Sequence, residues 1–152
     1  MAVSRDETVR RVGSMTAALR DEGLRLTHQR LEVVREIAAT DEHPDVESVY
    51  RGVRARVPTI SLDTVYRTLA TLVARGLVVR VATTEGAARY DAATSPHHHY
   101  VCTRCGSMRD VVDAALDAVD VPDGVRALGS VETVEVRMRG VCAACAEKGV
   151  LP

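Results

Sequence analysis

The first half of the chain carries apolar residues at helical spacing in four successive segments. A residue suited to a helix end flanks each segment: Gly23 closes the first, and Thr27, Asp45 and Ser61 precede the next three. Breaks at 43–44 and at Pro58 separate the later segments. We therefore expect four helices with these apolar faces: Val9, Val12, Met15 and Leu19; Leu31, Val34, Ile37 and Ala38; Val46, Val49, Tyr50 and Val53; Val65, Leu69, Leu72 and Val73.

The pattern changes to that of β-structure after Gly76. Residues 77–81 form a β-rich run, residues 82–87 are typical of a turn, and a second short strand ends at 89–90. Helices followed by such a hairpin are typical of a winged helix-turn-helix. The last helix before the hairpin, which follows Ser61, is then expected to enter the DNA major groove.

The remaining residues predict a second, smaller module. Residues 100–102 and 107–112 resemble short strands, 113–128 a helix interrupted near 122–124, and 134–139 alternate apolar and polar positions as a half-buried strand does. We expect an α+β protein with two domains, an N-terminal winged helix-turn-helix domain at 1–90 and a small α/β domain at 91–152. The hinge is expected at about 89–96.

Composition adds one constraint on stability and one on location. The 152 residues include no Phe and no Trp, so the cores must rely on Val, Leu and Ala and on some additional constraint. The sequence has no signal-peptide pattern and no apolar run long enough to span a bilayer, which favours a cytoplasmic protein with reduced thiols.

The net charge of -1 does not by itself indicate nucleic-acid binding. It conceals an asymmetry, because residues 1–90 carry 14 Arg against 12 Asp and Glu, whereas residues 91–152 carry 6 Lys and Arg against 9 Asp and Glu. A local basic surface on the first domain is therefore compatible with the composition.

Four cysteines form two Cys-x-x-Cys pairs with 36 residues between the pairs. Two such pairs suit a tetrahedral zinc ion, which would be structural because four sulfurs leave no open position. Zinc binding would contribute roughly 10–16 kcal/mol towards folding. Unrelated buried cysteines and a redox pair are the alternatives, although a redox pair would require one pair at a strand-to-helix turn. The predicted zinc ligands are Cys102, Cys105, Cys142 and Cys145.

A run of three histidines precedes the first cysteine pair. On a strand, His97 and His99 point to one face and His98 to the other, so His97 and His99 can share a metal ion. Asp91 and Asp110 are near in sequence, and His43 could reach the cluster from the first domain. Such a shell suits divalent iron, manganese, nickel or zinc. The alternative is a polar loop that contains histidines by chance.

Several motifs together resemble the Fur family of metal-responsive repressors, and within it the peroxide sensors of the PerR group. The resemblance covers nearly the whole chain and rests on 23–30 (GLRLTHQR), 43–44 (HP), Ser61 with 64–67 (TVYR) and Leu69, 76–78 (GLV), the histidine run and both cysteine pairs. It implies a winged helix, a C-terminal dimerisation domain and a regulatory metal at the hinge.

The resemblance also implies roles for particular residues. The regulatory Fe(II) or Mn(II) would be held by His43, Asp91, His97, His99 and Asp110, with aspartates favouring the peroxide-sensing group over iron sensors, where Glu is usual at both positions. Oxidation-sensitive histidines would be His43 and His97. A homodimer would bind a palindromic operator in double-stranded DNA, with contacts expected from Arg25, Ser61, Thr64, Tyr66 and Arg67.

Other function classes stay open at this point. A Fur-type repressor could respond to iron, manganese or nickel without sensing peroxide. A His/Asp metalloenzyme is a second class, but no general base or nucleophile stands out beyond the ligands, so we do not expect an enzyme. A zinc-stabilised protein-interaction module is a third, and it predicts no affinity for DNA.

Overall fold

The computed structural model describes residues 3–83 and 86–149. It confirms the expected mixture of helices and small sheets. The chain divides into two compact units, 1–94 and 95–152. The assignment of a DNA-binding and a dimerisation role to the two parts stays a prediction. The predicted turn at 82–87 includes residues 84–85, which lie outside the described residues. Over 3–83 and 86–149, no helix has the length and apolarity needed to cross a membrane.

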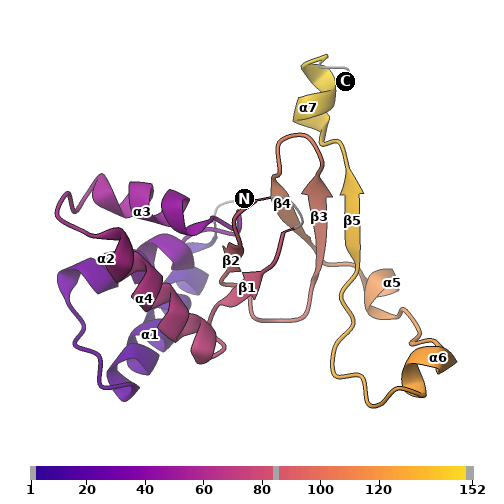
Figure 1. Ribbon diagram of the computed structural model, residues 1–152, viewed down its shortest axis with the longest axis horizontal. Coiled ribbons are helices and arrows are strands. Elements are labelled where there is room, and N and C mark those ends of the chain that lie inside the picture. The colour runs from indigo at the N-terminus through magenta and orange to yellow at the C-terminus, as the bar shows by residue number, and fades with distance from the viewer. Residues whose placement is uncertain (1–2, 84–85, 150–152) are drawn as a thin grey trace. The chain divides into compact units, whose positions relative to one another are not determined.

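The first unit contains four helices and a hairpin (Figure 1): α1 Arg5–Asp21, α2 His28–Ala38, α3 Val46–Arg54, α4 Leu62–Ala74, β1 Val79–Val81 and β2 Arg89–Asp91. The expected helix ends are confirmed. The side chains of Thr27, Asp45 and Ser61 each accept a hydrogen bond from the backbone N–H three residues later. Gly23 follows α1 with φ of 70°, a conformation that favours glycine. β1 and β2 pair antiparallel.

The helices of this unit enclose one apolar core, to which all four contribute. Its fully buried side chains include Leu19, Ile37, Val49 and Leu69. One predicted core residue is wrong, since Val9 is 65% exposed. The fully buried residues of α1 begin at Met15 and Val12 packs against the core half-buried, whereas Val9, one turn earlier, points to solvent.

The second unit is built on a three-stranded sheet with strand order β4-β3-β5. Its elements are β3 His98–Cys102, β4 Met108–Val111, α5 Ala114–Asp117, α6 Asp123–Arg126, β5 Arg137–Gly140 and α7 Ala143–Glu147. β3 lies in the centre, antiparallel to β4 and parallel to β5 (Figure 1). The parallel pairing returns the second cysteine pair to the first.

Two predictions for the second unit were wrong in extent. The helix expected at 113–128 is replaced by the short helices α5 and α6, neither of which buries a residue. When no other element covers its apolar side chains, a helix gains little beyond its own hydrogen bonds, and Pro122 interrupts these. The strand expected at 134–139 begins only at Arg137, because its pairing with β3 starts at the His99–Arg137 register.

The second unit buries few apolar side chains. Among its described residues only Cys102 and Met108 belong to the buried hydrophobic set, and the connected apolar core lies entirely in the first unit. Several large apolar side chains are instead exposed in the single chain: Val112, Val119, Val125, Leu128, Val131, Val134 and Val141. This unit therefore requires stabilisation from another source.

Candidate metal centres

The four cysteines of the second unit converge. Their sulfur atoms all lie within 4.8 Å of one another, and the Sγ atoms of Cys105 and Cys142 are 3.8 Å apart. A tetrahedral zinc ion with Zn–S bonds of about 2.3 Å places its sulfurs about 3.8 Å apart. None of the four cysteines forms a disulfide. The donor set and its dimensions therefore fit zinc.

Short turns bring each cysteine pair into position. After Cys102 at the end of β3, the N–H of Gly106 donates to the Cys102 carbonyl at 3.0 Å, and Gly106 has φ of 70°. In the second pair, the N–H of Cys145 donates to the Cys142 carbonyl at 3.0 Å. The N–H of Thr103 donates to the Gly140 carbonyl at 2.7 Å, which joins the first turn to the end of β5.

The backbone around the sulfurs favours thiolates at the first pair. Backbone N–H donors from Cys105 and Cys142 lower the pKa of the Cys102 thiol to about 6, and a hydrogen bond with the Ser107 side chain lowers that of Cys105. The neighbouring Cys142 sulfur raises the pKa of Cys145 to about 12. All four sulfurs would become thiolates at these distances only with a cation between them, because negative charges so close repel one another.

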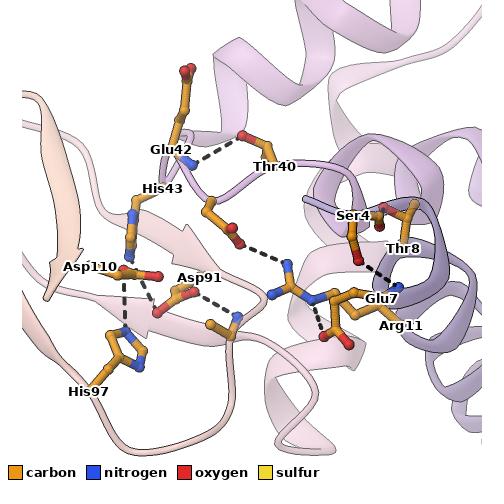
Figure 2. Close-up of polar contacts among 12 residues, drawn as sticks. Ser4, Glu7, Thr8, Arg11, Thr40, Glu42, His43, Asp91, His97 and Asp110 are labelled. Carbon is orange, nitrogen blue, oxygen red and sulfur yellow. Dashed lines mark hydrogen bonds and ion pairs between the residues drawn. The ribbon is translucent and has the colours of Figure 1, made fainter. Parts of the chain in front are cut away.

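In the first unit, His43 and Asp91 form a buried pair. The Nε2 atom of His43 lies 3.3 Å from Oδ2 of Asp91, and the two side chains are 0% and 2% exposed (Figure 2). The other carboxylate oxygen of Asp91, Oδ1, accepts a hydrogen bond from the N–H of Ala93 at 2.7 Å. Asp91 ends β2 and His43 precedes α3, so both positions are fixed by regular elements.

The backbone of His43 has an uncommon conformation that sequence reasoning did not predict. Its φ is 51°, and it is the only described non-glycine residue with positive φ. Two contacts with β2 hold the segment: Nη1 of Arg89 donates to the His43 carbonyl at 3.1 Å, and the N–H of Tyr90 donates to the Pro44 carbonyl at 2.9 Å. The hairpin therefore orients the His43 side chain.

In the second unit, His97, His99 and Asp110 bring three donor atoms together; we call them the three-donor cluster. The Nε2 atoms of the two histidines are 3.0 Å apart, and Oδ1 of Asp110 lies 3.4 Å from Nε2 of His97 and 3.7 Å from Nε2 of His99 (Figure 2 shows His97 beside Asp110). Asp110 on β4 pairs with His99 on β3. His98 points elsewhere, with Nε2 3.1 Å from Asp117.

The second nitrogen of each ring determines what the cluster can bind. Nδ1 of His97 lies 2.7 Å from the Ser95 carbonyl, and Nδ1 of His99 lies 3.0 Å from Oε1 of Glu135, a contact not anticipated from the sequence. Because a carbonyl and an ionised carboxylate only accept, both Nδ1 atoms carry hydrogen, and Nε2 of each neutral ring has a lone pair. Two such lone pairs facing a carboxylate oxygen form a site for a cation.

The residues expected to contact DNA lie on the surface of the first unit. Tyr66 on α4 is 50% exposed, and Arg67 is exposed with its Nε 2.8 Å from Oδ2 of Asp63. Arg25 is also exposed. Ser61 and Thr64 have a role in capping α4, since the Ser61 hydroxyl accepts from the Thr64 N–H at 3.1 Å. Their contacts with DNA stay predictions.

Known proteins provide a comparison for this arrangement. A family model described as "Ferric uptake regulator family" matches residues 21–138. "Ferric uptake regulation protein 1" of Mycolicibacterium fortuitum is 44% identical over 106 residues, which are 68% of this chain and 64% of that protein. "Peroxide-responsive repressor PerR" of Staphylococcus epidermidis is 30% identical over 135 residues, 88% of this chain and 89% of that protein.

A solved structure adds a three-dimensional comparison. The Campylobacter jejuni peroxide stress regulator superposes with a TM-score of 0.67 and 32% identity, covering 86% of this chain and 98% of that one. The family model, at residues 21–138, includes parts of both units.

Proposed function

Because this chain belongs to the ferric uptake regulator family, whose members are metal-responsive transcriptional regulators, we propose that it is a metal-dependent repressor that senses peroxide. In this proposal a homodimer binds a palindromic operator when Fe(II) or Mn(II) is present. The observation that carries the proposal is the chemistry of the His/Asp ligands, divided between the two units. His43 and Asp91 belong to the first unit, and the three-donor cluster belongs to the second.

Neither ligand set is sufficient by itself for a first-row divalent ion. The first unit offers one imidazole and one carboxylate, and the second offers two imidazoles and one carboxylate. Imidazole and carboxylate ligands suit Fe(II) and Mn(II), which accept more ligands than either set supplies. We therefore infer that one ion binds both sets, and that its binding favours one arrangement of the two units over others.

Peroxide sensing would follow from the ligands themselves. Bound Fe(II) would supply the redox chemistry that activates peroxide. One peroxide oxygen would be added to a ring carbon of a histidine ligand, and the other would leave as water. His43 and His97 are the proposed targets, as in the peroxide sensors that the sequence resembles. The altered ring would coordinate more weakly, which would release the constraint between the units and lower the affinity for DNA.

DNA binding would use α4 of the first unit, the helix before the hairpin. Tyr66 and Arg67 are exposed near its beginning, which suits contact with base edges in the major groove. Arg25 would contact the phosphates or the minor groove. Two copies of α4 in a dimer would meet successive half-sites of the operator.

Dimerisation and structural zinc are proposed for the second unit. Its exposed apolar side chains, such as Val112 at 80% and Leu128 at 87%, would be covered by a second copy of the chain. Its small buried core makes a structural metal necessary, and the four cysteines fit zinc. Zinc in this role would leave the histidines available for the regulatory ion.

Operator binding measured with different metals tests the proposal. The zinc-loaded protein is titrated against operator DNA with Fe(II), Mn(II), Zn(II) or Ni(II), each before and after peroxide. We expect Fe(II) and Mn(II) to promote operator binding, and peroxide to abolish only the binding that depends on Fe(II). Mass spectrometry should then detect one added oxygen on a peptide that contains His43 or His97. Unmodified histidines together with oxidised zinc cysteines would overturn it.

A second candidate is a metal-responsive repressor that does not sense peroxide. It is favoured by the 44% identity to a relative named for ferric uptake regulation, against 30% for the peroxide-responsive one. The same experiment separates the two, because this candidate predicts Fe(II)-dependent operator binding that survives peroxide. A metalloenzyme is disfavoured, since the family consists of transcription regulators.

A further inference from the structure

We propose that Glu135 is a positioning residue for the regulatory metal: its carboxylate fixes the proton of His99 on Nδ1 and so presents the Nε2 lone pair to the ion. This inference rests on the proposed function, in which His99 is a ligand. It adds a residue that the sequence patterns did not single out, because Glu135 lies outside the His/Asp set and outside every motif.

The contacts of His99 divide the ring into a metal-facing and a carboxylate-facing side. Nδ1 lies 3.0 Å from Oε1 of Glu135, whereas Nε2 faces His97 at 3.0 Å and Asp110 at 3.7 Å. The imidazole is buried at 5% exposure, and the Glu135 carboxylate is 44% exposed at the edge of the site. Histidines that bind metals commonly donate their other N–H to a carboxylate in this manner.

Strand pairing places the carboxylate beside the ring. The N–H of His99 donates to the Val136 carbonyl at 3.1 Å, and His99 is in register with Arg137 of β5. Glu135, one residue before Val136, is therefore held next to His99 by the backbone ladder. Nη2 of Arg137 also donates to Oε1 of Glu135 at 3.1 Å, which restrains the carboxylate oxygen that accepts from the ring.

The other histidine of the cluster has a different anchor. Nδ1 of His97 lies 2.7 Å from the backbone carbonyl of Ser95, a neutral acceptor that no side-chain substitution removes. A carboxylate polarises the imidazole more strongly than a carbonyl and raises its strength as a ligand. His99 should therefore depend on a side chain for its orientation and its donor strength, and Glu135 is that side chain.

Three variants of the full-length, zinc-loaded protein test this role. Glu135→Ala removes the acceptor, Glu135→Gln retains an oxygen acceptor without charge, and Glu132→Ala removes an exposed carboxylate from the same segment as a control. Mn(II) affinity is measured from the free-ion signal in electron paramagnetic resonance. The tautomer of His99 is read from long-range ¹H–¹⁵N correlations in the absence of Mn(II), and bound zinc is measured in parallel.

We expect Glu135→Ala to weaken Mn(II) binding by about 10–100-fold, the range for loss of such partners. The same variant should lose the single Nδ1-protonated form of His99 while retaining zinc. Glu135→Gln should keep that tautomer with a smaller loss of affinity, and Glu132→Ala should match the wild type. If Glu135→Ala left both the Mn(II) affinity and the His99 tautomer unchanged, the role of Glu135 would be overturned, but the proposed function would not. Failure of the wild-type protein to bind Mn(II) would instead overturn the proposed function, and this inference with it.

Discussion

Arg89 holds the backbone of His43, a proposed metal ligand, in a left-handed conformation. The Nη1 atom of Arg89 donates to the His43 carbonyl at 3.1 Å, and φ of His43 is 51°. A residue with a Cβ atom adopts this conformation at a cost, which surrounding contacts must offset. The hairpin that ends in Asp91 therefore positions both ligands of the first unit, one through its own side chain and the other through Arg89.

Replacing Arg89 with Ala should weaken Mn(II) binding without removing a ligand. A hydrogen bond of this kind contributes about 0.5–1.5 kcal/mol, so the affinity should fall by about 2–12-fold. The measurement is Mn(II) titration of the zinc-loaded protein. Arg80→Ala, which alters an exposed residue on the neighbouring strand β1, serves as the control and should bind Mn(II) as the wild type does. Equal affinities for the two variants would refute the role of Arg89.

Local signals explain why much of the first unit could be predicted. The helix ends of the first unit each depend on a few adjacent residues, so they could be predicted from local sequence. They are the caps at Thr27, Asp45 and Ser61 and the glycine after α1. The two clusters of candidate metal ligands were also visible as residue types. His97, directly before β3, and His99 in β3 bring their Nε2 atoms to within 3.0 Å of each other, as the alternation of side chains in an extended segment predicts.

What could not be predicted depends on contacts between distant segments. The positive φ of His43 is maintained by Arg89, 46 residues away, and Glu135 meets His99 only because β5 pairs parallel to β3. The prediction of one helix at 113–128 was wrong for a related reason. Its apolar periodicity was present, but no described element of the unit buries that face. Periodicity predicts a helix only where a packing partner exists.

Arg67→Ala should lose operator binding while dimer and zinc content stay intact. Arg67 pairs with Asp63 at 2.8 Å, but both side chains are about 70% exposed or more, so the pair contributes little and does not bury the guanidinium. Loss of a base contact should cost about 1–3 kcal/mol in DNA affinity. Footprinting of the Mn(II)-loaded protein measures this, with Arg20→Ala on α1 as the control. A normal footprint from Arg67→Ala would exclude the assignment.

Asp63→Ala should have the opposite effect on DNA affinity. Its carboxylate competes with DNA for Arg67 and also repels phosphates, so its removal should tighten operator binding and steepen the dependence on salt. If Asp63→Ala bound the operator at low salt with the affinity of the wild type, Arg67 would not exchange its contact with Asp63 for a contact with DNA.

The stability of the first unit should depend on the ionisation of Glu32, a nearly buried residue of α2. Nε of Arg56 donates to its Oε2 at 2.9 Å and lowers the pKa of the Glu32 carboxyl, with a further contribution from Arg35 at 2.6 Å. Because the folded pKa lies below the unfolded one, the stabilisation is complete above the ordinary pKa of Glu. It is lost as the pH falls through the lowered value.

Thermal unfolding between pH 7 and pH 3 tests this contribution. Glu32→Gln should be less stable than the wild type at pH 7 by about 1–2 kcal/mol, a value reduced for the partial exposure of Arg56. The difference in the free energy of unfolding between Glu32→Gln and the wild type should become smaller towards pH 3. Glu47→Gln, which alters an exposed carboxylate on α3, controls for general charge effects. A difference that is independent of pH would mean that the ion pair is not the cause.

Removal of zinc should unfold the second unit before the first. The four cysteines hold the ends of β3 and β5 together, whereas the connected apolar core lies in the first unit. In Cys105→Ala we expect bound zinc to fall from one per chain to none, and amide signals of β3 to β5 to lose dispersion while α1 to α4 keep theirs. Arg104→Ala, between the two cysteines, should retain zinc. Persistence of the β3–β5 signals in the zinc-free variant would contradict a structural role.

Substitution of the three consecutive histidines by Ala, one at a time, should separate metal binding from stability. His97→Ala and His99→Ala each remove a nitrogen of the three-donor cluster, so Mn(II) affinity should fall by more than about 10-fold while zinc is retained. His98 is buried on the opposite side, where its Nδ1 accepts from the Val136 N–H at 3.1 Å and its Nε2 faces Asp117.

His98→Ala should therefore bind Mn(II) within about two-fold of the wild type but lower the stability of the second unit. An N–H that loses its acceptor costs about 1–3 kcal/mol, and a domain of this size loses roughly 4–8 °C in Tm per kcal/mol. Mn(II) titration and thermal unfolding of the same three variants provide both measurements. If His98→Ala abolished Mn(II) binding while His97→Ala did not, the assignment of ligands to the two faces of β3 would be reversed. The His97–Asp110 contact would then be structural.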